Sequence, residues 1–183
     1  MQQYRHWWLA ALTLAWWLAG AGPSKGQAPD VMTIQNTIVT FSSTDDLLYL
    51  NGSLVNVQDV ANNGNLRMQG NAQLILLGNL VNQVANIPLM TSGSAGIVRF
   101  MGALPQWVDG VGLHRYHKIY LNTGGAGSLY LNADLYLRDS LRFLSGNIDL
   151  ANQGLVLGNT GLFAGENNSN RAFSTGNGYV EAR

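Results

Sequence analysis

The chain has 183 residues, with ten basic and ten acidic side chains, 11% charged residues, 22 glycines and no cysteine. The absence of cysteine excludes disulfides and cysteine-ligated metals, and the balanced charge argues against a nucleic-acid partner, because binding to phosphate backbones favours an excess of lysine and arginine. A soluble enzyme more often carries about a quarter charged residues. The polar surface must therefore come from Asn, Gln, Ser and Thr, which suit tight corners.

Residues 1–26 have the layout of a secretory signal peptide. Arg5 and His6 precede an apolar run over residues 7–21, and small residues follow it. As a helix this run would reach only ~22 Å, short of the ~30 Å hydrocarbon layer, which disfavours the alternative of a retained membrane anchor. We therefore expect export, with cleavage at the alanines that end the run or just before Gln27, and a mature chain that does not span a membrane.

Residues 27–46 are predicted to be a lead-in or cap, with one alternating strand over Met32–Phe41. From Leu47 onward, short apolar segments recur and end in Asn or Gly. Two stretches interrupt this rhythm, over residues 82–95 and 109–118, and we expect them to be loops that leave the repeating structure.

The clearest repeat is a series of apolar pairs that begin about six or seven residues apart, which is too close for helices. The pairs are Leu129/Leu131, Leu135/Leu137, Leu141/Phe143, Ile148/Leu150 and Leu155/Leu157. Three such strands would make one coil of roughly twenty residues, the period of a β-solenoid. We predict an all-β fold, a right-handed parallel β-helix over residues 47–183. The whole mature chain after residue 26 would form about seven coils stacked ~4.8 Å apart.

An antiparallel sandwich or meander is the competing architecture, since it also contains many short strands. The connections through Ala133-Asp134 and Asp139-Ser140 lack the Asn-Gly chemistry of tight hairpins, which favours the parallel coil. The last segment, Gly178–Arg183, reads as the start of another strand. We therefore expect a chain truncated at its C-terminus, with downstream domains in a longer protein.

Several motifs follow one another in a fixed order: Gly96–Gly102, Gln106–Gly110, Lys118–Asn122, Leu129–Leu135, Leu144–Leu150 and Leu155–Gly158. This order resembles repetitive Asn/Gly-rich secreted surface proteins of Bacteroidetes, which are substrates of type IX secretion. The resemblance implies export, surface display and a structural or adhesive role, and it transfers no catalytic motif.

Three residues make a candidate metal site: His114, His117 and Asp109 together offer two imidazoles and a carboxylate. No helix is indicated there to bring the histidines to one face, so we read them as loop residues and predict no metal site and no cofactor.

Gly124–Gly127 superficially resembles a phosphate-binding loop but lacks the following Lys-Ser/Thr and helix, so we read it as a turn. The Gly-Gly-x-Gly-x-Asp calcium nonapeptide is also absent.

Secreted parallel coils include enzymes that cleave polysaccharides with clustered carboxylates, for which Asp134, Asp139 and Asp149 are the best candidates. The first two are expected at corners, where Asp caps its own backbone, and Asp149 is expected to project outward. We therefore name none of these three aspartates as a catalytic residue.

Outward aromatic residues offer a possible glycan platform, formed by Tyr120, Tyr130 and Tyr136. A coil of twenty residues would place Tyr136 beside Val156 and Tyr130 beside Asp149, so the three need not share a patch.

The leading hypothesis is an exported, non-catalytic structural or adhesive scaffold, either secreted or displayed on the extracellular face of the outer membrane. Its partners would be glycans or other surface proteins. The alternative is a carbohydrate-active enzyme or a glycan-binding module built on a β-helix. Carboxylates converging in a groove would favour the enzyme.

Overall fold

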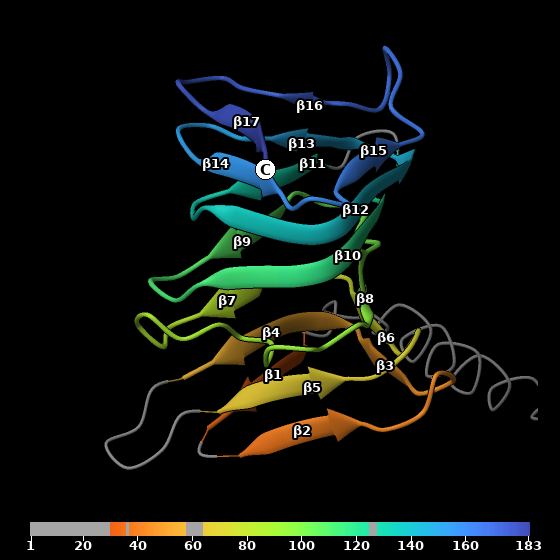
Figure 1. The fold of residues 1–183 in the computed structure, drawn as a ribbon, viewed down its shortest axis with the longest axis vertical. Coiled ribbons are helices and arrows are strands. Elements are labelled where there is room, and N and C mark those ends of the chain that lie inside the picture. The colour runs from red at the N-terminus through yellow and green to blue at the C-terminus, as the bar shows by residue number, and fades with distance from the viewer. Residues whose placement is uncertain (1–29, 36, 58–63, 125–127) are drawn as a thin grey trace, which may run out of the picture.

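The computed structural model describes residues 30–35, 37–57, 64–124 and 128–183. The predicted signal peptide lies outside the described residues. The described part is all β, and the strands run parallel to their neighbours in a stack of about six turns (Figure 1). This confirms the predicted parallel β-solenoid and excludes an antiparallel sandwich. Within the same part of the chain, no helix has the length and apolar character needed to cross a membrane.

Three sheets make up the stack. The first sheet contains, in order, β1 (Asp30–Ile34), β4 (Gly52–Asn56), β7 (Leu80–Asn82), β9 (Gln106–Asp109), β11 (Ser128–Leu131), β13 (Asn147–Asp149) and β16 (Ala172–Phe173). The second contains β3 (Leu47–Leu50), β6 (Gln73–Leu76), β8 (Ile97–Phe100), β10 (His114–Asn122), β12 (Leu135–Ser145), β14 (Gly154–Leu157) and β17 (Tyr179–Ala182), with β15 (Leu162–Ala164) paired to β12. The third contains only β2 (Ile38–Phe41) and β5 (Asn65–Met68).

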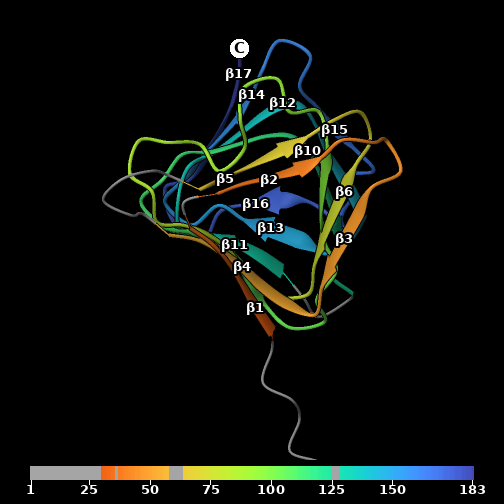
Figure 2. The ribbon, with the colours of Figure 1, turned by 90° about the horizontal axis from the view of Figure 1, so that it is seen from below.

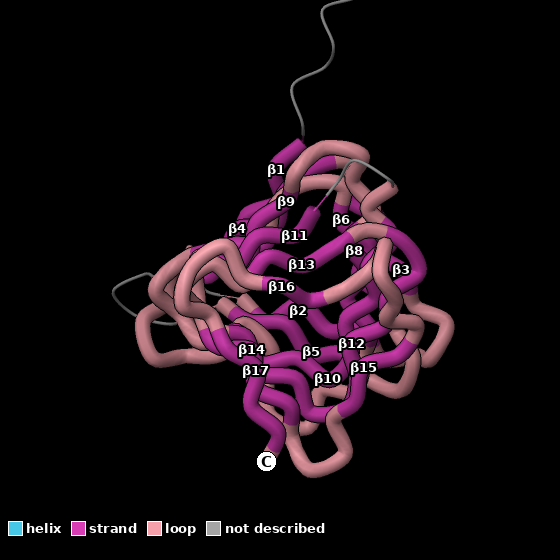
Figure 3. Tube along the Cα trace, turned by 90° about the horizontal axis from the view of Figure 1, so that it is seen from above, coloured by secondary structure: helices cyan, strands magenta, loops and turns pink. Residues whose placement is uncertain are grey.

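Two long strands, β10 and β12, each supply two sides of one coil. The first half of β12 pairs with β14, whereas its second half pairs with β15, and β8 pairs only with the second half of β10. The register between β10 and β12 shifts between Tyr116 and Lys118, where one side passes into the next. Isolated bridges at Met90 and Pro88 link β5 to the start of β10, so strands surround the interior on three sides (Figures 2 and 3).

The core consists of apolar side chains stacked in columns from coil to coil. One column in the second sheet runs through Leu50, Leu76, Phe100, Leu121 and Phe143, which are register partners. The last four are almost completely buried. Since each fully buried residue of this size contributes about 1.5–3 kcal/mol, the columns are the main source of stability.

The coils are longer and less uniform than the sequence suggested. Leu80 pairs with Leu54, 26 residues earlier, and with Val108, 28 residues later, whereas Leu129 and Ile148 pair across 19 residues. The predicted seven coils are therefore about six. The coil from Leu80 to Val108 contains the loop predicted over residues 82–95, which the structure places between β7 and β8.

Two expectations about individual elements were wrong. Residues 32–41 do not form one strand, because β1 and β2 lie in different sheets. Residues 109–118 are not a single loop, since β10 begins at His114. The glycines at 110 and 112 suggested a longer loop, but the turn occupies only the residues between Asp109 and His114.

Two buried asparagines form a short amide ladder inside the coil. Asn56 Nδ2 donates to Asn82 Oδ1 at 3.0 Å, and both side chains are completely buried. Asn82 Nδ2 donates to the carbonyls of Ile87 and Leu113, and its Oδ1 accepts from the Val84 backbone. The amide thus satisfies backbone groups of the loop and of the following coil, which confirms the expectation that asparagines serve the corners.

Asn82→Ala should lower the free energy of unfolding by about 3 kcal/mol, because it leaves several buried polar groups without partners. Asn132→Ala is the matched control, since Asn132 is exposed and should tolerate the change within about 0.5 kcal/mol. The midpoint of urea unfolding measures both effects. Equal midpoints for the two variants would contradict a structural role for the ladder.

Candidate functional site

Corner carboxylates and amides connect each coil to the next. Asp134 Oδ1 accepts from the backbone N–H of Gly154, and Asp149 accepts from the backbone N–H of Thr175. These acceptors lie 20 and 26 residues before their donors, about one coil. The two aspartates therefore hold the fold at different corners.

Asp149 is the clearest correction to the sequence interpretation, which placed it on the outer surface. Its side chain is only 3% exposed. Besides the Thr175 backbone, it accepts from Ala151 N at 2.9 Å and from the Thr175 hydroxyl at 2.9 Å. Strand β13 ends at Asp149, so its side chain turns into the corner, where backbone donors surround it.

The third candidate carboxylate, Asp139, lies at the bend of β12. Its Oδ2 is 3.4 Å from Lys118 Nζ and 3.6 Å from His117 Nε2. The three aspartates considered as carboxylate candidates are thus each engaged by separate groups of the fold. In the described ranges, no three His, Asp or Glu side chains are close enough to hold a metal ion.

The two histidines predicted as loop residues lie in β10 and have separate surroundings. His114 is buried, and its Nδ1 is 2.8 Å from the Tyr116 hydroxyl. His117 Nδ1 is 2.9 Å from the Ala95 carbonyl. Asp109 instead accepts from the backbone N–H of Gly110. The structure therefore does not assemble the candidate metal site.

Burial lowers the pKa of His114 to about 4, and the backbone and charge of Asp109 oppose this only in part. Burial also raises the pKa of Tyr116, so the pair is uncharged at neutral pH. The unfolded chain, in contrast, would protonate this histidine near pH 6.5. Stability contributed by neutral His114 is therefore present above pH 6.5 and is lost as the pH falls towards 4.

We expect the free energy of unfolding to fall by up to about 3 kcal/mol between pH 7 and 4 through His114 alone. His114→Gln should flatten this dependence, whatever it does to stability at pH 7. His117→Gln is the control, and it should retain most of the slope because His117 is only partly buried. Urea unfolding at a series of pH values measures the slope, and parallel curves for wild type and His114→Gln would contradict the assignment.

Asp149→Ala should destabilise the fold by about 3 kcal/mol, since three hydrogen bonds to a buried carboxylate are lost. Asp134→Ala should cost less than about 1.5 kcal/mol, because Asp134 is exposed and accepts one described bond. Thermal unfolding compares the two. An unchanged or raised melting temperature for Asp149→Ala would instead be typical of a residue kept for chemistry.

Of the glycine segment, the structure describes only Gly124, which lies in a turn. Gly124 has a φ of 69°, which favours glycine, and its N–H donates to Ser145 Oγ. Residues 125–127 lie outside the described residues. The part that can be seen is consistent with the predicted turn.

The three candidate tyrosines do not form one platform. Tyr130 lies in the first sheet and stacks on Trp107, with ring centroids 5.7 Å apart. Tyr120 lies between the guanidinium groups of Arg99 and Arg142, at 4.9 and 5.7 Å from the ring. The neighbours predicted for Tyr136 and Tyr130 are confirmed, because Tyr136 pairs with Val156 and Tyr130 pairs with Asp149.

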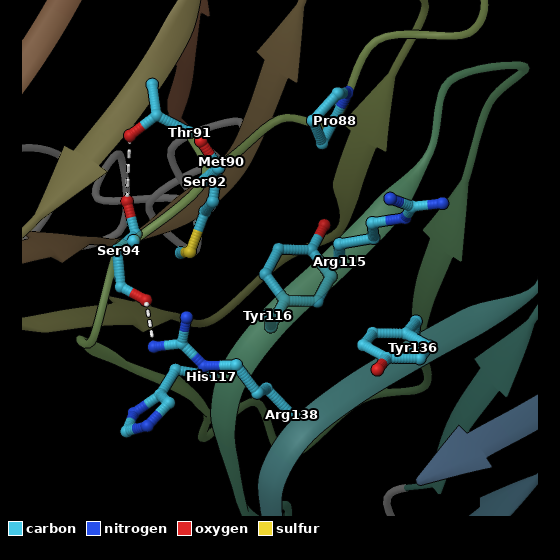
Figure 4. Close-up of a pocket in the computed structure, with 11 residues that line it drawn as sticks. Pro88, Met90, Thr91, Ser92, Ser94, Arg115, Tyr116, His117, Tyr136 and Arg138 are labelled. Atoms are coloured by element: carbon cyan, nitrogen blue, oxygen red, sulfur yellow. Dashed lines mark hydrogen bonds between the residues drawn. The ribbon is translucent and has the colours of Figure 1, made fainter. Parts of the chain in front are cut away.

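Tyr136 belongs instead to a groove that the sequence interpretation missed. The groove lies between the segment Pro88–Ser94 and the first halves of β10 and β12, and has a volume of about 170 Å³ (Figure 4). Arg115 and Arg138 also line it. The only signal in the sequence was the expected loop over residues 82–95, which supplies one wall.

The fold and these contacts define a protein of the parallel β-solenoid class. Comparison with known protein families, curated proteins and solved structures found no match to this chain.

Proposed function

We propose that the chain is an exported, non-catalytic scaffold with a structural or adhesive role, either secreted or held at the extracellular face of the outer membrane. Its action is mechanical. The stacked coils make a stiff rod that holds its loops, and any attached domain, away from the cell.

The observation that carries this proposal is the use of polar side chains at the corners. The carboxylates that an enzyme would need are hydrogen bonded to backbone groups or paired with cations of the fold. Such groups stabilise the resting structure and are not poised for proton transfer. This supports the scaffold over the alternative of a carbohydrate-active enzyme.

Export is supported by the leader-like residues 1–26 and by the resemblance to repetitive Asn/Gly-rich surface proteins of Bacteroidetes. The motif order that carries the resemblance falls on successive coils, from β8 to β14. Gln106, the glutamine of this pattern, is buried and joins neighbouring turns through the carbonyls of Leu76 and Gly78. We extend the proposal to secretion by the type IX route.

The full chain carrying a C-terminal epitope tag should reach the medium or the cell surface of a Bacteroidetes host. Mass spectrometry should find a mature N-terminus between residues 20 and 27. Leu14→Arg should retain the chain inside the cell by breaking the apolar run, whereas Leu14→Ile should be exported normally. An intact leader on a cytoplasmic product would refute export.

A further inference from the structure

The groove beside Tyr136 occurs where the third side of the solenoid is incomplete. Below it are the strands β2 and β5, and above it are the first halves of β10 and β12. Between them, the chain makes only isolated bridges at Met90 and Pro88. Because a full strand is missing here, side chains on both sides border an open space (Figure 4).

The charged side chains that line this space are cationic. Arg115 extends from β10 and Arg138 from β12, and both are exposed. Neither makes an ion pair with any residue that the structure describes. The neighbouring carboxylates are already paired, Asp139 with Lys118 and Glu181 with Arg183. The groove is therefore a site of uncompensated positive charge.

Both guanidinium groups are held in place by the protein. Arg115 lies over the Tyr136 ring at 5.8 Å, and Arg138 donates to the Ser94 carbonyl at 3.2 Å. Each guanidinium has five N–H donors, so these contacts leave several free for a ligand. Preorganised guanidiniums bind planar carboxylates with two parallel hydrogen bonds, at a reduced cost in side-chain entropy.

A second hollow continues the groove toward the N-terminal coils. It shares Thr91 and Ser92 with the first and adds Ile38, Thr40 and Arg67. The resulting strip has three guanidinium groups interspersed with hydroxyls. The anionic groups of a ligand would bind the guanidiniums, and its hydroxyl groups would bind the threonine and serine hydroxyls between them. An acidic glycan has this alternation of anionic and hydroxyl groups.

The dimensions favour sugars over the other polyanions. The groove has a volume of about 170 Å³, far more than one water molecule requires, so it can admit part of a sugar ring. Nucleic acids and anionic membranes are bound by larger surfaces with a basic excess, and this chain has no such excess.

We propose that this strip is a binding site for a carboxylated glycan, with one uronate-type carboxylate paired with Arg115 and another paired with Arg138. This deepens the adhesive part of the proposed function by naming a ligand class. It does not depend on export, because binding is measured on the purified full chain.

Isothermal titration of the full chain with oligogalacturonate, a carboxylated glycan, tests the site. Saturable binding should weaken about tenfold or more in Arg115→Gln and in Arg138→Gln, since each loses charged hydrogen bonds. Arg142→Gln is the matched control, because Arg142 is equally an exposed arginine over a tyrosine but lies outside the groove. The control should bind as tightly as the wild type.

Four further ligands distinguish the source of the anion. Neutral dextran should not bind, and a DNA duplex and phosphatidylglycerol vesicles should bind more weakly than oligogalacturonate at equal ionic strength. Binding should weaken as the pH falls towards 3 and the carboxylates of the glycan take up protons, whereas binding of dextran sulfate would persist, in the pH range over which circular dichroism shows the fold retained.

The proposal is overturned by the absence of saturable binding to oligogalacturonate, by equal losses in Arg115→Gln and Arg142→Gln, or by tighter binding of DNA or vesicles. A preference for dextran sulfate that survives at pH 3 also overturns the carboxylate assignment. Circular dichroism of each variant establishes that the fold is retained. None of these outcomes affects the export experiment, so the two proposals fail separately.

Discussion

The hydrogen bonding of the corners is the constraint on which this solenoid depends. Strand amides are paired in ladders between coils, but the chain must turn between short strands, and the N–H groups there cannot all join a ladder. Side chains of one coil accept these bonds from the next, as Ser53 does from Asn79 and Asn147 from Arg171. An unsatisfied buried donor costs about 1–3 kcal/mol. This cost applies where the N–H is closed off from solvent, as in the bond that Met68 N–H donates to Ser94 Oγ of the next coil.

This constraint also determines the surface. Once the corners fix how coils stack, outward residues fall into columns with their register partners, as Arg99, Tyr120 and Arg142 do along the second sheet. The neighbours of an outward side chain are then set by coil length. Residues about one coil apart in sequence become direct partners, which is why aromatic and cationic groups meet here without any local motif.

The fold could be predicted because apolar pairs at six- or seven-residue intervals leave no room for helices or hairpins. The positions of His114 and Asp149 were misread, because in each case a tertiary contact outweighed the local sequence pattern. His114 looked like a loop residue beside Gly110 and Gly112, yet the coil accepts it because Tyr116 supplies a hydroxyl for its ring. Asp149 looked outward by simple alternation, but the strand ends there and the corner turns it inward.

The groove could not be predicted from spacing, since its walls come from parts of the chain that only the stacking order brings together. Ser94 and Arg138 are 44 residues apart and meet across coils of unequal length. A regular solenoid would present a continuous third sheet and no hollow. The departure from regularity in the coil between β7 and β8 therefore creates the recess, while the regular coils on either side supply rigid strands that hold the arginines. In a repeating scaffold of this kind, specific binding is most readily built where one strand is missing, because the neighbouring turns keep the gap open at little further cost in ordering.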